Sequence, residues 1–81
     1  MTENEIRAIV RAAIEDIAPD ADLDGIDPTE SLREELDLDS MDFLALVRAL
    51  HAELGVSIPE ADYRAIDSLD GCTAYLARAL G

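Results

Sequence analysis

Three stretches of the chain repeat apolar residues at the three- and four-residue steps of one helix face, and proline or glycine lies between them. This period is typical of amphipathic α-helices, and no stretch alternates convincingly as a half-buried strand would. We predict long helices over residues 3–18 and 40–54 and from Ser68 onward. A short helix is predicted at 60–64 and a helical turn at 31–36. The predicted fold is therefore all-α, a small antiparallel bundle of three longer helices and one short helix with a long first connection.

Each long helix has an apolar face that should be buried. The first face consists of Ile6, Ile9, Val10, Ala13, Ile14 and Ile17. The second consists of Leu44, Val47, Leu50 and Leu54, with Leu46 beside it. The last consists of Leu69, Cys72, Thr73, Leu76 and Leu80. With the second helix oriented in this way, its outward stripe consists of Met41, Ala45, Arg48 and Ala52.

The composition indicates one small acidic domain over residues 1–81. A chain of 81 residues is near the lower size at which a single core sustains folding, and its 49% hydrophobic content separates it from disordered acidic tails. The net charge of −13 disfavours nucleic acid and anionic membrane and favours basic protein partners. The single Cys72 excludes an internal disulfide and a multi-cysteine metal site, and we expect no metal. With no apolar run of ~20 residues and no signal-like N-terminus, we expect a cytoplasmic monomer.

The most informative local feature is the junction between the acidic connection and the second long helix. Asp39 is a good N-cap, and Asp42 can complete a capping box with Asp in place of the usual Glu. Ser40 then falls at the first helical position, with its hydroxyl at the surface beside unpaired N–H groups. Because these groups and the helix dipole favour negative charge, a serine at this position is well placed to carry a phosphodiester.

The sequence Asp39-Ser40-Met41, followed by Asp42 and an amphipathic helix, resembles the Asp-Ser-Leu signature of acyl and peptidyl carrier proteins. Length, acidity, helix count and helix order extend the resemblance over nearly the whole chain. It implies that Ser40, flanked by Asp39 and Met41, carries 4′-phosphopantetheine, which a phosphopantetheinyl transferase moves from coenzyme A. Asp37 stands where the family often has glycine, and Met41 replaces leucine. Asp tolerates left-handed backbone better than most residues, and Met conserves the volume of Leu.

The resemblance implies an acyl carrier protein, not an enzyme, that holds acyl intermediates as thioesters in fatty-acid, polyketide or a related specialised biosynthesis. An aminoacyl or peptidyl carrier with the same arm is the alternative. The implied partners are an acyl- or aminoacyl-loading ligase and downstream acyl-transfer enzymes. Family members usually carry acids on the outward stripe, whereas this stripe is apolar or basic, which favours a specialised pathway. The residues predicted to contact partners are Asp37, Asp42, Phe43, Ala45 and Arg48, although Phe43 could equally belong to the core.

A second tripeptide, Asp67-Ser68-Leu69, spells the family signature more literally than the stretch around Ser40. Both serines are predicted at helix starts, so local chemistry does not separate them. Only residues 69–81 follow Ser68, too few for the two helices that the family places after its modified serine. An ordinary N-cap is a sufficient role for Ser68, and we predict attachment at Ser40.

Two other classes of protein are alternatives, an acidic calcium-binding protein and an unmodified helical adaptor. Asp20–Ile26 matches the opening of an EF-hand loop, but Ser31 occupies the position of the bidentate Glu and Pro28 lies inside the loop. A catalytic role is disfavoured because His51, the only histidine, is about 16 Å from Ser40 along the same predicted helix. Cys72 is predicted to belong to the core, and we expect no catalytic residue.

Overall fold

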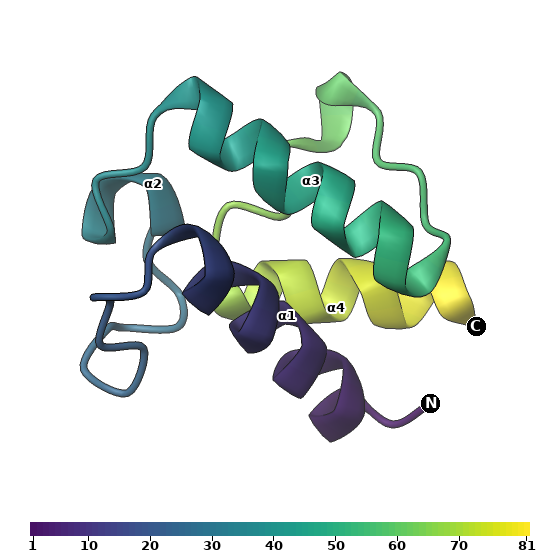
Figure 1. The fold of residues 1–81 in the computed structure, drawn as a ribbon. Helices are drawn as coiled ribbons and strands as arrows, with labels where there is room; N and C mark the ends of the chain where they lie inside the picture. The colour runs from purple at the N-terminus through teal and green to yellow at the C-terminus, as the bar shows by residue number, and fades with distance from the viewer.

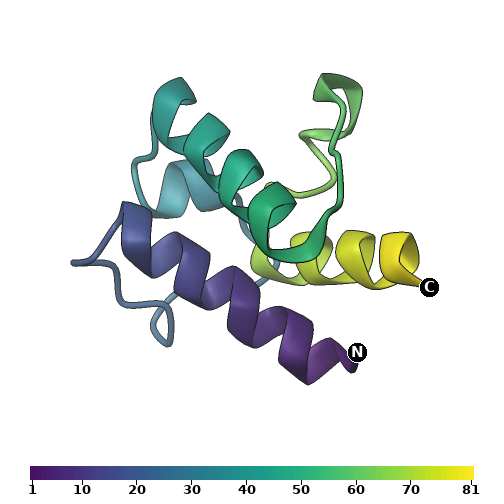
Figure 2. The ribbon, with the colours of Figure 1, turned by 45° about the vertical axis from the view of Figure 1, so that its right-hand side comes forward.

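The computed structural model describes residues 1–81 and contains helices but no strands. Its elements in chain order are α1 (Glu3–Ile17), α2 (Leu32–Glu35), α3 (Ser40–Leu54), the 3-10 helix η1 (Glu60–Asp62) and α4 (Leu69–Leu80). Figure 1 and Figure 2 show α1 running in the opposite direction to α3 and α4. α1 packs against both of these helices. The predicted all-α bundle of three longer helices is therefore confirmed.

Local signals set the helix ends close to where the sequence predicts them. α1 begins with the complete capping box of Thr2 and Glu5, and it ends one residue before the predicted Ala18. α3 ends at Gly55, whose φ of 68° is left-handed, as is common for a glycine that follows a helix. The short helix predicted at 60–64 is only a three-residue 3-10 helix, and turns follow it. Its N-cap residue is Pro59, which forms no side-chain hydrogen bond to the start of this helix.

A single cluster of 16 buried apolar residues forms the core. α1 supplies Ile6, Val10, Ala13 and Ile14, and α4 supplies Leu69, Cys72 and Leu76. The connections supply Leu23, Leu38, Val56, Ile58 and Ile66, and α2 supplies Leu32. Thr73 is the one buried polar residue, and its hydroxyl donates a hydrogen bond to the Leu69 carbonyl at 2.8 Å. The predicted apolar faces of α1 and α4 are largely confirmed, except that Leu80 at the end of α4 is exposed.

The predicted buried face of α3 is right for Leu50 and for Leu46 beside it, but wrong for Leu44. The structure buries Phe43, Leu46 and Leu50, whereas Leu44 is 37% exposed and Val47 is half-buried. The reason is that α3 is apolar around much of its circumference, so the three- and four-residue period fits two neighbouring faces equally well. The structure selects the face that buries Phe43, the largest apolar side chain of the helix.

The long connection between α1 and α2 is ordered by its own side chains. The Asp27 carboxylate accepts hydrogen bonds from the N–H and the hydroxyl of Thr29, at 2.9 and 2.7 Å. Leu23 is buried under the connection and Ile26 is half-buried. None of the helices has both the length and the hydropathy that a bilayer crossing needs.

Candidate functional site

The first turn of α3 exposes Ser40 and fixes the backbone around it. The Asp39 carboxylate accepts a hydrogen bond from the Asp42 N–H at 2.8 Å, and the Asp39 N–H donates to the Asp42 carboxylate at 3.3 Å. The predicted capping box is therefore confirmed. Ser40 is the first residue of the helix and is exposed. The cap thus holds a serine hydroxyl at the surface on a rigid helix start.

A tight turn from α2 delivers the chain to this helix start. Asp37 has a φ of 53° and is the only residue other than glycine with a positive φ. The N–H of Leu38 donates to the Arg33 carbonyl at 3.0 Å. This bond and the left-handed residue between them are the hallmarks of a Schellman motif, in which glycine is the usual left-handed residue. The left-handed backbone that Asp tolerates better than most residues is therefore present at Asp37.

Arg33 is the one side chain that forms a hydrogen bond with Ser40, and the sequence prediction missed it. Its Nη2 lies 3.5 Å from the Ser40 hydroxyl oxygen. A surface groove of about 280 Å³ adjoins these two residues and is lined by Arg33, Ser40, Phe43, Leu44, Glu60 and Tyr63. The only sequence signal was a single arginine inside an otherwise acidic run seven positions before Ser40, and the spacing of a turn does not report where a side chain lies.

The predicted contact residues around Ser40 do not all reach the surface. Asp37 and Arg48 are exposed, whereas Asp42 and Ala45 are half-buried. The prediction that Phe43 belongs to a contact surface was wrong, because its side chain is only 2% exposed. Phe43 packs edge-on against the ring of Tyr63, with the ring centroids 5.4 Å apart.

The exposed apolar side chains beside Ser40 are instead Met41 and Leu44. Met41 is 79% exposed, which places one of the two predicted neighbours of the serine fully at the surface. Leu44 is exposed because α3 turns its Phe43 face inward. This pair, which we call the Met41–Leu44 patch, takes the place that the sequence assigned to Phe43.

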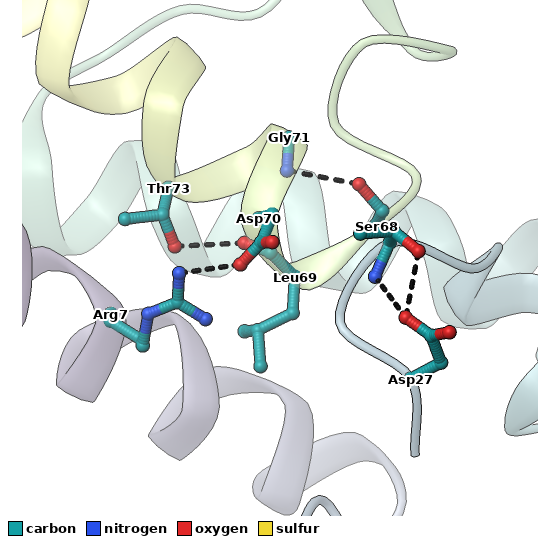
Figure 3. Close-up of polar contacts among 8 residues, drawn as sticks. Arg7, Asp27, Ser68, Leu69, Asp70, Gly71 and Thr73 are labelled. Atoms are coloured by element: carbon teal, nitrogen blue, oxygen red, sulfur yellow. Dashed lines mark hydrogen bonds and ion pairs between the residues drawn. The ribbon is translucent and has the colours of Figure 1, made fainter.

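The competing tripeptide, Asp67-Ser68-Leu69, has structural roles that occupy its polar groups. The Ser68 hydroxyl caps α4 by accepting a hydrogen bond from the Gly71 N–H at 2.9 Å, as Figure 3 shows. The Asp67 carboxylate accepts from the Ser31 hydroxyl at 2.6 Å and from the Arg33 N–H at 3.1 Å. Asp67 therefore ties α2 to the start of α4, and Ser68 is half-buried.

The groups that could make Ser40 a catalyst are not beside it. Arg33 is its only side-chain hydrogen-bond neighbour, and a guanidinium stays protonated and cannot act as a base. His51 is exposed near the other end of α3, where its Nδ1 lies 3.4 Å from the Ser57 hydroxyl. Cys72 is fully buried, and burial raises the pKa of its thiol to about 12. No three His, Cys, Asp or Glu side chains come together as a metal site, and Asp24 of the acidic connection pairs with Arg11 at 2.7 Å.

The whole bundle, and not only its serine, can be compared with known families. A family model described as the phosphopantetheine attachment site matches residues 4–76, which span the bundle from α1 into α4. The chain belongs to this family. Members of the phosphopantetheine attachment site family are carriers that hold a covalently attached 4′-phosphopantetheine arm and are not enzymes. No curated protein matches this carrier chain.

The helix start of α3 fits the chemistry of such an arm. A phosphopantetheine ester on serine is a phosphodiester, which carries negative charge and therefore suits a helix N-terminus with a nearby cation. Ser40 offers an exposed hydroxyl at that position, and Arg33 supplies the cation. As in the family generally, the partners of this carrier are a phosphopantetheinyl transferase and biosynthetic enzymes.

Proposed function

We propose that Ser40 is the attachment residue and that this carrier holds acyl intermediates as thioesters on the arm. The observation that carries the proposal is the exposed Ser40 hydroxyl at the capped start of α3. The competing Ser68 hydroxyl is already the acceptor of the α4 cap, so its modification would remove that hydrogen bond. We further propose that residues 1–81 act as one carrier domain, because all four α-helices contribute to one core.

Attachment at Ser40 requires an outside catalyst. The Ser40 oxygen would form a bond to the phosphorus of the pantetheine arm, and the pyrophosphate bond of coenzyme A would break to release the adenosine bisphosphate. The hydroxyl proton would pass to a base of the transferase, because the chain places no base beside Ser40. The carrier's own contribution is to hold the hydroxyl in the open at a fixed backbone position.

Intact mass measurements test this proposal directly. The wild-type chain and the variants Ser40→Ala and Ser68→Ala are incubated with coenzyme A and a broad-specificity phosphopantetheinyl transferase. We expect one phosphopantetheine on the wild type and on Ser68→Ala, and none on Ser40→Ala. Addition to Ser40→Ala, or its loss only in Ser68→Ala, would overturn the assignment. Circular dichroism of both variants checks that an unmodified chain is still folded.

The cargo is proposed to be acyl, in fatty-acid, polyketide or a related specialised biosynthesis. A specialised pathway is supported by the outward side of α3, where Arg48 and Ala52 are exposed and no carboxylate occupies the predicted stripe. Loading the phosphopantetheinylated chain with an acyl-activating and an aminoacyl-activating ligase separates the two cargo classes. Exclusive aminoacyl loading would favour the peptidyl carrier alternative.

The partner surface is proposed to combine acids at the start of α3 with a small apolar contact. Asp37 is exposed at the turn, and the Met41–Leu44 patch lies beside Ser40. An arrangement of exposed acids around a modest apolar patch suits a partner with a basic rim and an apolar centre. Charge reversal of Asp37 is expected to slow association with such a partner, and Met41→Ala to speed dissociation.

A further inference from the structure

Arg33 is one of four arginines of this acidic chain that form no ion pair, and it is the one whose guanidinium approaches Ser40. Arg7 binds Asp70 at 2.6 Å and Arg11 binds Asp24 at 2.7 Å. Arg33 forms no such ion pair, although the chain carries 19 acidic residues against 6 basic ones. Its guanidinium Nη2 instead lies 3.5 Å from the hydroxyl of Ser40. A cation without an ion-pair partner therefore stands beside the hydroxyl proposed to carry the arm.

The fold holds both the backbone and the side chain of Arg33 in place. At the backbone, its N–H donates to the Asp67 carboxylate at 3.1 Å and its carbonyl accepts from the Leu38 N–H at 3.0 Å. At the side chain, the guanidinium carbon lies 5.4 Å from the centroid of the Phe43 ring, within the range of a cation–π contact. Phe43 is itself buried and packed against Tyr63. The Arg33 guanidinium is thus held beside Ser40, although Arg33 is exposed to solvent.

The two carboxylates of the capping box around Ser40 already accept backbone hydrogen bonds. Asp39 and Asp42 cap the helix and accept backbone N–H bonds from each other. Each of these carboxylates therefore already accepts a hydrogen bond from a donor other than the Arg33 guanidinium. A phosphate group placed on the Ser40 oxygen would bring its two unbridged oxygens within reach of a guanidinium that already approaches that oxygen. The planar fork of arginine can stack on an aromatic face and donate to a phosphate at the same time, which an ammonium group does less well.

We propose that Arg33 is a phosphate-positioning residue, whose guanidinium binds the phosphodiester on Ser40 and anchors the root of the arm against Phe43. This inference rests on the proposed attachment at Ser40. It assigns α2 a role in the modified protein, which is to carry the cation that fixes the first bonds of an otherwise flexible tether. The groove lined by Leu44 and Tyr63 then adjoins the anchored end of the arm.

The test compares the unmodified and phosphopantetheinylated forms of the wild type, Arg33→Gln, Arg33→Lys and the control Arg48→Gln. Arg48 is also exposed and its replacement changes the net charge equally. Intact mass first establishes that each purified modified sample carries one arm, so slower modification of a variant does not affect the comparison. Failure of the wild type to accept the arm, or its acceptance by Ser40→Ala, would count against the proposed attachment and not against Arg33 specifically.

The first readout is the ³¹P chemical shift of each modified sample. We expect the wild type and Arg48→Gln to share one shift and Arg33→Gln to differ. The second is the melting temperature of the modified form minus that of the unmodified form at low salt. We expect this difference to be about 2–4 °C more positive in the wild type than in Arg33→Gln, the size expected of an exposed charge pair in a domain of this length. Arg33→Lys should recover part of it, and added salt should shrink it.

A purely structural role for Arg33 would give a different pattern. It would lower the melting temperatures of both forms equally, leaving their difference unchanged, and the ³¹P shift would not move. That pattern in Arg33→Gln overturns the proposal. An effect of equal size in Arg48→Gln would also overturn it, because a general charge effect would then account for the result.

Discussion

Replacing Asp37 with glycine should stabilise the carrier, although it removes a residue from the proposed partner surface. Asp37 holds a left-handed φ of 53° in the turn that ends α2. Left-handed backbone costs an L-residue about 1–2 kcal/mol, and Asp pays less than most because its side chain is short and polar. Glycine removes that cost but adds about 0.5–1 kcal/mol of unfolded-state entropy. The net expectation is a gain of roughly 0.5 kcal/mol, or about 2–4 °C in melting temperature.

Thermal unfolding of Asp37→Gly, Asp37→Asn and Asp37→Ala separates backbone strain from charge. Asn removes the charge but keeps a side chain that tolerates left-handed backbone, so it reports the relief of repulsion in this acidic chain. Ala removes the charge and tolerates the conformation poorly, and it should be the least stable of the three. High salt should reduce the gain in Asn but leave the separation between Gly and Ala. Equal stability of Gly and Ala would refute the argument from φ.

Two further predictions concern α4. Gly71→Ala should lower the free energy of unfolding by about 1–3 kcal/mol, although alanine has the better helix propensity. The reason is that an added Cβ would lie 2.5 Å from the Ala65 carbonyl oxygen and 2.7 Å from the Ser68 hydroxyl oxygen. A rise in the denaturant midpoint would contradict this. Cys72 in the folded chain should not react with a thiol reagent at pH 8, because it is fully buried with a pKa raised to about 12. The unmodified chain should therefore give no rapid reaction with the reagent, and the phosphopantetheinylated chain should give one equivalent, from the thiol of its arm. Rapid labelling of Cys72 in the unmodified chain would show this reasoning to be wrong.

The fold could be predicted wherever several local signals agreed. Thr2 and Glu5 fixed the start of α1, and Gly55 fixed the end of α3, because capping residues act through their immediate neighbours. The orientation of α3 could not be predicted in the same way. Its apolar residues surround much of the helix, and the choice of Phe43 over Leu44 depends on Tyr63, a contact between residues distant in sequence.

The candidate site likewise has a local part that could be predicted from the sequence and a part that could not. The helix start with Asp39 and Ser40 is a local motif, and the sequence was sufficient to predict its geometry. Arg33 reaches Ser40 only because the turn at Asp37 brings α2 back beside α3. Phe43 was predicted to contact partners, and this was wrong because the sequence did not show that α3 turns Phe43 toward the core.

The hydrogen bonds of Asp67 have a consequence for how mutations in this chain should be interpreted. Through them, a residue just before α4 holds the short helix that carries Arg33. Loss of the Asp67 side chain is expected to loosen α2, and carrier activity would then fall although Ser40, the proposed attachment residue, is unchanged. A genetic screen would then score the Asp67-Ser68-Leu69 tripeptide as another attachment motif, although on this reasoning its mutation acts indirectly, through the position of Arg33 beside Ser40.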